Sequence, residues 1–249
     1  MIDRAFDGLW HFVHLIGGAS EGARVVERDG VAAAVIPAAP ERSVVNSVVY
    51  RGPGDLERAY DDIAAAYEEI GAIWTVWVHP GDDRTAAFLE GRGHFYDAEP
   101  MAMAHDLKGV ERPPAGALSD WTADGDLAVV GPLNDRAYGI ETGSFTNSIL
   151  SLPDGASRVY VVRDGGEPVA CLMMSDHDAN TDVEMVAVLP EARGRGLSGL
   201  LLRHALADAV ERGCETSTLV ATELGYPVYE RLGFRPLEPI PMWELQASP

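Results

Sequence analysis

The sequence contains one long internal repeat, and this repeat constrains the fold more than any other feature. The glycine-rich turn Arg51-Gly52-Pro53-Gly54 has a counterpart in the second half, Arg193-Gly194-Arg195-Gly196. The spacing between Gly71 and Gly213 equals the spacing between the two turns, so the helical segments after the turns have equal length. Further matches follow in the same order: FLEGRGH (88–94) with VYERLGF (228–234), and EPMAM with IPMWE. This series predicts one fold unit used twice, each unit closing its own core.

Length and composition place the boundary between the two units. The 249 residues are enough for two small domains with hydrophobic cores. The stretch KGVERPPAGALSDWTADG (108–125) is rich in proline, glycine and polar residues, as expected of a joint. We therefore expect a domain over residues 1–107, a linker over 108–119 and a second domain over 120–249.

The second half alternates between strand and helix signals, which predicts a mixed α/β fold with a mixed (α+β) sheet. DLAVVGPLNDRAYGI indicates a short strand turning into a helix, and SRVYVVRDGGEPVACLMM a hairpin that turns at residues 164–166. TDVEMVAVLP indicates a strand, followed by a helix over 197–212 that Gly213 ends. TSTLVA indicates another strand, GYPVYERLG a short helix, and the tail a final strand pair. MIDRAFDGLWHFVHLIGG predicts an amphipathic helix rather than a signal peptide.

Composition argues against several classes of function. The formal net charge is −20 and Lys108 is the only lysine, whereas nucleic-acid phosphates require a basic surface. No apolar run is long enough to span a membrane. The two cysteines, Cys171 and Cys214, are not spaced like metal ligands. We therefore expect reduced core thiols, no bound metal and a cytoplasmic protein.

The turn at 193–196 has the properties of a site for a pyrophosphate. Gly194 and Gly196 allow successive backbone N–H groups to converge, and the following helix presents the positive end of its dipole. Arg193 and Arg195 add full positive charges suited to phosphate oxygens. A glycine-rich turn with two solvated arginines is the alternative from this stretch alone. A dinucleotide-binding fingerprint is a poor match because its glycine spacing and later acidic residue are missing.

Two motifs in the second half resemble the GNAT superfamily of acyl-CoA-dependent N-acyltransferases. That family has [Q/R]-x-x-G-x-[G/A] at the start of a long helix, and this chain has VAVLP (186–190) followed by RGRGLS (193–198). The family's C-terminal motif corresponds to TELGYPVYERLGF, which retains Tyr229-Glu230. The chain departs from the pattern at Ser198, at Thr222 in place of asparagine and at Gly225 in place of alanine. The resemblance covers residues 120–249 well and residues 1–107 in degenerate form.

The resemblance implies acetyl-CoA as co-substrate and an amine as acceptor. Backbone groups of Val186 and Val188 would pair with the pantetheine amides like an added strand. The full set implied for CoA binding is Val186, Val188, Arg193, Gly194, Arg195, Gly196, Leu197, Ser198 and Thr222. The segment after the first strand shapes the acceptor pocket in this family, so Tyr138, Glu141 and Phe145 are the candidate acceptor-binding residues.

An ammonium group cannot attack a thioester until a base removes its proton. Asp182 and Glu184 lie on the strand before the turn and, by alternation, share a face with Val186 and Val188. Because this strand carries a base in many GNAT members, Glu184 is the first candidate and Asp182 the second; either could instead be a rim carboxylate. The resemblance implies that Tyr229 acts as the acid that protonates the departing thiolate or donates a hydrogen bond to it.

The first half lacks the corresponding groups. Pro53 replaces Arg195, which removes a charge and a backbone donor, and Asp55 falls where it would repel a pyrophosphate. Leu89 occupies the position that matches Tyr229. The first unit is therefore expected to be a degenerate GNAT-like domain without a cofactor site, in a structural role, as one wall of the acceptor cleft.

The sequence thus predicts an N-acetyltransferase that moves an acetyl group from acetyl-CoA to a primary amine of a small molecule or peptide. Transfer would occur by direct attack in a ternary complex, with no nucleic-acid or membrane partner and with a monomer or homodimer as the assembly. A non-catalytic acyl-CoA sensor is the alternative from another class. An enzyme resembling mycothiol synthase, which shares the tandem plan, is a minor alternative.

Overall fold

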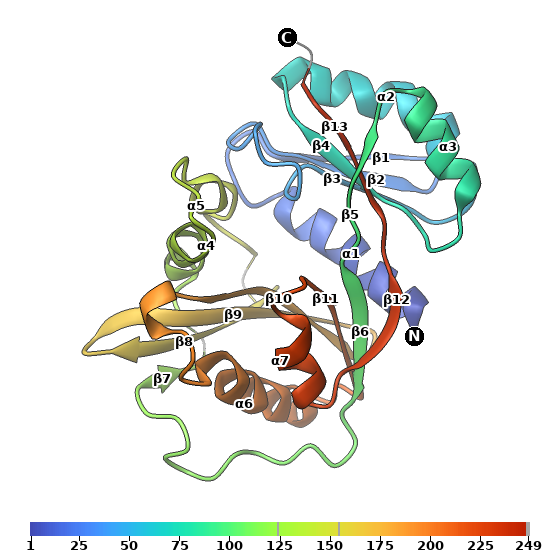
Figure 1. Ribbon diagram of the computed structural model, residues 1–249. Helices are drawn as coiled ribbons and strands as arrows, with labels where there is room; N and C mark the ends of the chain where they lie inside the picture. Colours follow the sequence, from blue (N-terminus) through green and yellow to red (C-terminus); the bar gives the residue numbers. More distant parts are fainter. Residues whose placement is uncertain (124, 154, 248–249) are drawn as a thin grey trace.

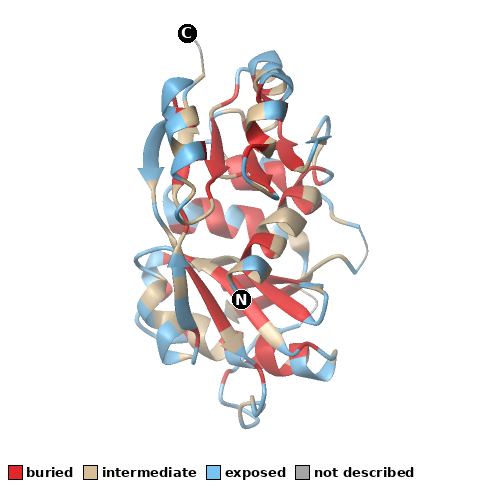
Figure 2. Ribbon diagram, turned by 90° about the vertical axis from the view of Figure 1, so that its right-hand side faces the viewer, coloured by how far each residue is buried: buried red, intermediate tan, exposed pale blue. Residues whose placement is uncertain are grey.

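The computed structural model describes residues 1–123, 125–153 and 155–247, and these form two mixed sheets, one above the other (Figure 1). Helix α1 (Ile2–Ile16) lies between the sheets and contacts strands of both. Buried positions run along the central strands of the two sheets (Figure 2), whereas β5 (Phe95–Ala98) and β12 (Arg235–Pro239) are mostly exposed. The predicted mixed α/β fold built from two units is confirmed. Within the described residues, no helix has both the length and the apolar character that a membrane crossing requires.

The N-terminal half consists of a helix, a hairpin, a strand, a long helix, a further strand, a second helix and two final strands. After α1 come β1 (Arg24–Arg28), β2 (Val31–Val35), β3 (Ser47–Tyr50), α2 (Asp55–Ile70), β4 (Trp74–Trp77), α3 (Asp83–Gly91), β5 (Phe95–Ala98) and β6 (Met101–Asp106).

The C-terminal half repeats this order with longer strands. Its elements are β7 (Trp121–Thr122), the 3-10 helix η1 (Leu127–Val129), α4 (Val130–Tyr138), α5 (Ser144–Ser148), β8 (Arg158–Asp164), β9 (Glu167–His177), β10 (Asn180–Val188), the 3-10 helix η2 (Pro190–Ala192), α6 (Leu197–Glu211), β11 (Thr216–Ala221), α7 (Tyr226–Arg231), β12 (Arg235–Pro239) and β13 (Met242–Leu245). The expected strand at DLAVV is wrong, because the Asp126 carboxylate accepts a hydrogen bond from the Ala128 amide and starts η1 there.

The repeat appears in the backbone of the two long helices. Helices α2 and α6 each begin directly after a glycine in the left-handed region, Gly54 with φ 83° and Gly196 with φ 72°. The conformation is one that a residue with a Cβ adopts only with strain. The glycine just before each helix therefore has the same conformation, although Gly194 has φ 77° and its counterpart Gly52 is not in this region.

The two units exchange one strand. The first sheet has the order β1-β2-β3-β4-β13-β5 and the second has the order β12-β6-β11-β10-β9-β8-β7. The last strand of each half thus lies in the other unit's sheet, as the crossing ribbons in Figure 1 show. The expectation that each unit closes its own core is wrong, and the predicted final pair, β12 and β13, is divided between the sheets. Each sheet therefore contains strands from both sides of the linker expected over residues 108–119. The sequence did not reveal this, because exchanging equivalent strands leaves the local sequence pattern unchanged.

Candidate functional site

Strands β10 and β11 separate in the middle of the second sheet. They pair in parallel only from Asn180 to Asp182, and β10 then bulges against β9 between Glu184 and Ala187. Met185 at this bulge has φ 50°. The bulge interrupts the alternation of side chains that the sequence predicted for this strand. A wedge therefore opens between the two strands, with peptide groups of β10 along one side.

Two polar side chains of α4 hold the bulge. Asn134 is almost fully buried, and its Nδ2 donates to the carbonyl oxygens of Val130 at 2.9 Å and Met185 at 3.1 Å. Tyr138 donates its hydroxyl to the carbonyl oxygen of Val186 at 3.1 Å. Sequence reasoning missed Asn134, whose only signal is a polar residue on the buried face of a predicted helix.

One cavity, the helix-side cavity, lies where the wedge meets the start of α6 and has a volume of about 330 Å³. Its lining contains all but one of the residues expected to bind CoA: Val186, Val188, Arg193, Gly194, Gly196, Leu197, Ser198 and Thr222, with Arg195 as the exception. Ala137, Tyr138, Leu224, Gly225, Val228 and Tyr229 are among its other lining residues.

The two arginines of the turn have different surroundings. The Arg193 guanidinium donates to the carbonyl oxygen of Ala137 at 2.6 Å and of Val188 at 3.3 Å, at the rim of the helix-side cavity. Arg195 instead forms an exposed ion pair with Asp164 at 2.6 Å. Amides in the first turn of α6 have no helical acceptor, so together with Arg193 they make this end of the cavity suited to an anion.

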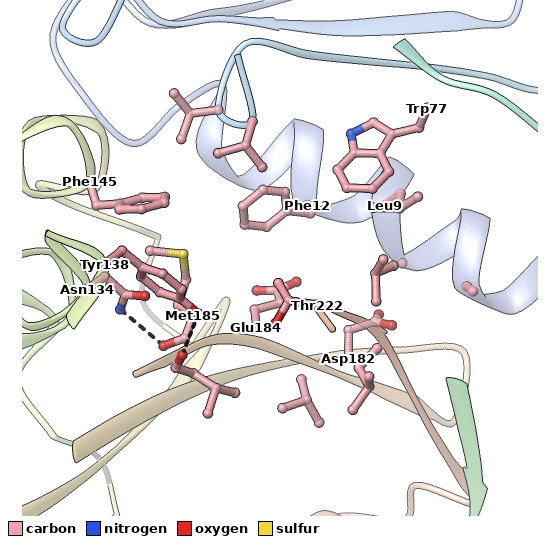
Figure 3. A pocket seen from close by; sticks show the side chains of 18 of the residues that line it. Leu9, Phe12, Trp77, Asn134, Tyr138, Phe145, Asp182, Glu184, Met185 and Thr222 are labelled. Carbon is pink, nitrogen blue, oxygen red and sulfur yellow. Dashed lines mark hydrogen bonds between the residues drawn. The ribbon is translucent and has the colours of Figure 1, made fainter. Parts of the chain in front are cut away.

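The second cavity, the inter-unit cavity, has a volume of about 290 Å³ and lies between α1 and β10 (Figure 3). The N-terminal unit contributes Ala5, Gly8, Leu9, Phe12, Arg42, Val44, Val45 and Trp77, and the C-terminal unit contributes Asn134, Tyr138, Phe145, Asp182, Val183, Glu184, Met185, Val186, Leu219, Val220, Thr222 and Tyr229. Gly8 allows α1 to come close, because a Cβ there would lie 2.3 Å from an oxygen of Asp182. The N-terminal wall was not predictable residue by residue, since none of these side chains forms a motif.

Glu184 lines this cavity and has one carboxylate oxygen without a hydrogen-bond partner among the described residues. Its Oε2 accepts a hydrogen bond from Ser175 at 2.9 Å, whereas its Oε1 is buried and has no partner among the described residues. Burial raises the pKa of Glu184 well above its ordinary value, and the neighbouring charge of Asp182 raises it further. A carboxylate with a raised pKa and an unoccupied oxygen has the properties of a general base.

Asp182 is the more constrained of the two candidate bases. Both of its oxygens are engaged, one with His177 Nε2 at 2.5 Å and the other with the hydroxyl of Thr218. The hydrogen bond to Asp182 raises the pKa of His177, as expected for a histidine that faces a carboxylate. Because both oxygens of Asp182 are already engaged, the geometry favours Glu184 as base.

Tyr229 lies at the junction and lines both cavities. Burial raises the pKa of its phenol, and the proximity of Tyr138 raises it further, so the hydroxyl keeps its proton at neutral pH. Its ring requires Gly225, because a Cβ at that position would approach the ring to 2.8 Å. Gly225, where this chain departs from the family pattern, thus leaves space for the Tyr229 ring.

Comparisons with known proteins agree with this geometry. Residues 155–236 match the family model described as the acetyltransferase (GNAT) domain. The C-terminal unit thus contains a match to the GNAT domain. The matched residues include the hairpin, the bulged strand, the glycine turn and the helix that carries Tyr229. A GNAT domain supports acyltransferase function in general.

Solved structures show that the fold of the whole chain is shared. A GCN5-related N-acetyltransferase from Kribbella flavida is 18% identical with a TM-score of 0.70, covering 99% of this chain and 95% of that one. A GCN5-related N-acetyltransferase from Sphaerobacter thermophilus is 18% identical, with a TM-score of 0.63 and coverage of 92% and 84%. A tandem GNAT protein from the clavulanic acid biosynthesis pathway is 18% identical, with a TM-score of 0.61 and coverage of 99% and 96%. A search of curated protein sequences found no match.

The N-terminal GNAT-like unit fills its own turn with a side chain. Asp55 Oδ2 accepts a hydrogen bond from the Gly52 amide at 2.8 Å, and its other oxygen pairs with Arg58. Leu89, the counterpart of Tyr229 in the repeat, is fully buried in the core. The N-terminal unit thus has the Asp55 carboxylate in its turn and Leu89 at the position where the C-terminal unit has the Tyr229 phenol.

The expected acceptor residues are only partly brought together. Tyr138 and Phe145 line the inter-unit cavity, but Glu141 is exposed and lies outside the lining of both cavities. Helix α4 ends just before Gly139, whose left-handed conformation turns the chain before Glu141.

Both cysteines are buried and unpaired, and burial raises the pKa of Cys171 to about 12 and that of Cys214 to about 11. Among the described residues, no group of three or more His, Cys, Asp or Glu could hold a metal ion.

Proposed function

We propose that the protein is an acetyl-CoA-dependent N-acetyltransferase that acts on a primary amine of a small molecule or peptide. One observation carries the proposal: the helix-side and inter-unit cavities meet at Tyr138, Val186, Thr222 and Tyr229. Two substrates bound on either side of this junction would have their reacting atoms side by side, as direct transfer requires.

The helix-side cavity fits acetyl-CoA. The open glycine turn and Arg193 would hold the pyrophosphate, and the unpaired edge of β10 would run beside the pantetheine arm. Acetyl-CoA supplies the activated acyl group as a thioester.

In the proposed reaction, Glu184 accepts the proton of the acceptor ammonium through its free Oε1. The amine nitrogen then attacks the thioester carbonyl carbon and the C–S bond breaks. The nitrogen loses a second proton as the amide forms, and this proton balances the one that the sulfur gains. Tyr229 donates a hydrogen bond or its proton to the sulfur as negative charge develops there, since its phenol is protonated. A sensor would need only the helix-side cavity; the second cavity and its unpaired carboxylate favour an enzyme.

The test is a panel of primary amines with acetyl-CoA, read by release of free thiol, together with calorimetric titration of acetyl-CoA. Amine-dependent thiol release and a stoichiometry near one per chain are expected, because Asp55 occupies the N-terminal turn. Binding without thiol release for every amine would favour a sensor. A stoichiometry near two would mean that the N-terminal unit keeps a cofactor site.

A further inference from the structure

The N-terminal wall of the inter-unit cavity contains a single charged side chain, Arg42, among apolar neighbours. Leu9 and Phe12 on α1, with Val44, Val45 and Trp77, make the rest of this wall largely apolar. The floor, from the C-terminal unit, carries the carboxylates of Glu184 and Asp182. The cavity therefore combines one cation, a carboxylate with a free oxygen and an apolar wall.

Among the described residues, the Arg42 guanidinium forms no hydrogen bond or ion pair. Its Nε is buried and has no hydrogen-bond partner, and no ion pair joins Arg42 to a carboxylate in residues 1–123, 125–153 and 155–247. The adjacent carboxylate, Glu41, instead accepts the hydroxyl of Ser144 at 2.6 Å. A buried donor without a partner is unfavourable, and a bound anion would satisfy it.

The orientation of Arg42 leaves its donors available. The guanidinium carbon lies 5.1 Å from the centre of the Phe145 ring, and both residues line the cavity. A guanidinium stacked on a ring keeps its in-plane N–H groups free for a carboxylate. This contact joins the two units, because Arg42 precedes β3 and Phe145 lies on α5.

Figure 3 shows the order of groups along the cavity. Phe145 and Tyr138 lie toward one end, Asp182 and Trp77 toward the other, and Glu184 projects between them. An amine next to Glu184 would thus have the cation on the Phe145 side and apolar surface on the Trp77 side.

We infer that the acceptor is an amino acid with an apolar side chain, or a close analogue carrying an anionic group beside the amine, and that Arg42 binds this anionic group. The inference rests on the proposed function. Glu184 would meet the amine, Arg42 the carboxylate, and Leu9, Phe12 and Trp77 the apolar side chain. The N-terminal unit would thereby determine acceptor specificity without binding a cofactor.

The experiment compares acceptors that differ only in the carboxylate: L-phenylalanine with 2-phenylethylamine, and L-leucine with 3-methylbutylamine. For the wild type, we expect kcat/KM for each amino acid to exceed that of its amine. Arg42→Gln should lower kcat/KM for the amino acids by roughly ten- to hundredfold, the range for losing one charge-assisted hydrogen bond, and leave the amines unchanged. Arg42→Lys, which keeps the charge but not the planar fork, should be intermediate.

Arg136→Gln is the matched control, because Arg136 pairs with Glu191 on the surface of α4, outside both cavities. It should leave all four rates unchanged. A wild type that prefers the amines, or an Arg42→Gln variant that loses activity equally toward amines and amino acids, would overturn the inference and leave the proposed function standing. Absence of thiol release with all four acceptors and with the wider amine panel would reject the proposed function, and the inference with it.

Discussion

Replacing Glu184 by glutamine tests the assignment of the base with little change in shape. The carbonyl oxygen of the amide can still accept the hydrogen bond from Ser175, so only the free carboxylate oxygen is lost. Removal of a general base typically lowers turnover by about 10²- to 10⁴-fold. We expect kcat of Glu184→Gln to fall within this range, with acetyl-CoA affinity unchanged because Glu184 lines only the inter-unit cavity.

The pH dependence provides a second readout. Because the pKa of Glu184 is raised, the wild-type rate should increase with pH as this carboxyl group loses its proton. The variant should lack this rise. Asp182→Asn should move the rise to lower pH, because the charge of Asp182 contributes to raising the pKa of Glu184.

Folding stability should change in the opposite sense from activity. A carboxyl group whose folded pKa is raised binds its proton more tightly in the native state, so its contribution to the unfolding free energy falls as pH increases from 4.5 through the folded pKa. Glu184→Gln should therefore be at least as stable as the wild type above neutral pH, measured by denaturant unfolding. Full activity of this variant at pH 7, or a loss of activity that parallels a loss of stability, would refute the assignment.

Three further predictions follow from the same structure. Arg193→Ala should weaken acetyl-CoA binding by about 1.5–3 kcal/mol, and Arg195→Ala by less because its pair with Asp164 points it away; equal effects in titration calorimetry would contradict this difference. Tyr229→Phe should lower turnover by roughly ten- to a thousandfold at unchanged cofactor affinity, and a fully active variant would remove the phenol from the mechanism. Ile240→Ala, at a fully buried site before β13, should cost about 2–5 kcal/mol, and the exchanged strands should make both sheets unfold in one transition; two separate denaturation steps would contradict that coupling.

Local chemistry allowed several elements of this protein to be predicted from sequence. The hairpin at Gly165 and Gly166 forms because both glycines adopt positive φ, and α6 begins where Gly196 does the same. The repeat revealed two units because equal spacing between glycines reflects equal helix lengths. The helix-side cavity could likewise be anticipated, since its turn, strand and helix are adjacent in sequence.

Long-range pairing decided the rest. The exchange of β6 and β13 left no trace in the sequence, because each strand carries the same pattern whichever sheet it joins. Arg42 and Phe145 meet only because the units pack together, and no local signal relates them. The difference between Asp182, with both oxygens engaged, and Glu184, with one oxygen free, depends on side chains from β9 and β11. Residue type and spacing thus determined which groups this protein has for catalysis, whereas burial and partners, which only the tertiary structure establishes, decided which of them are free to react.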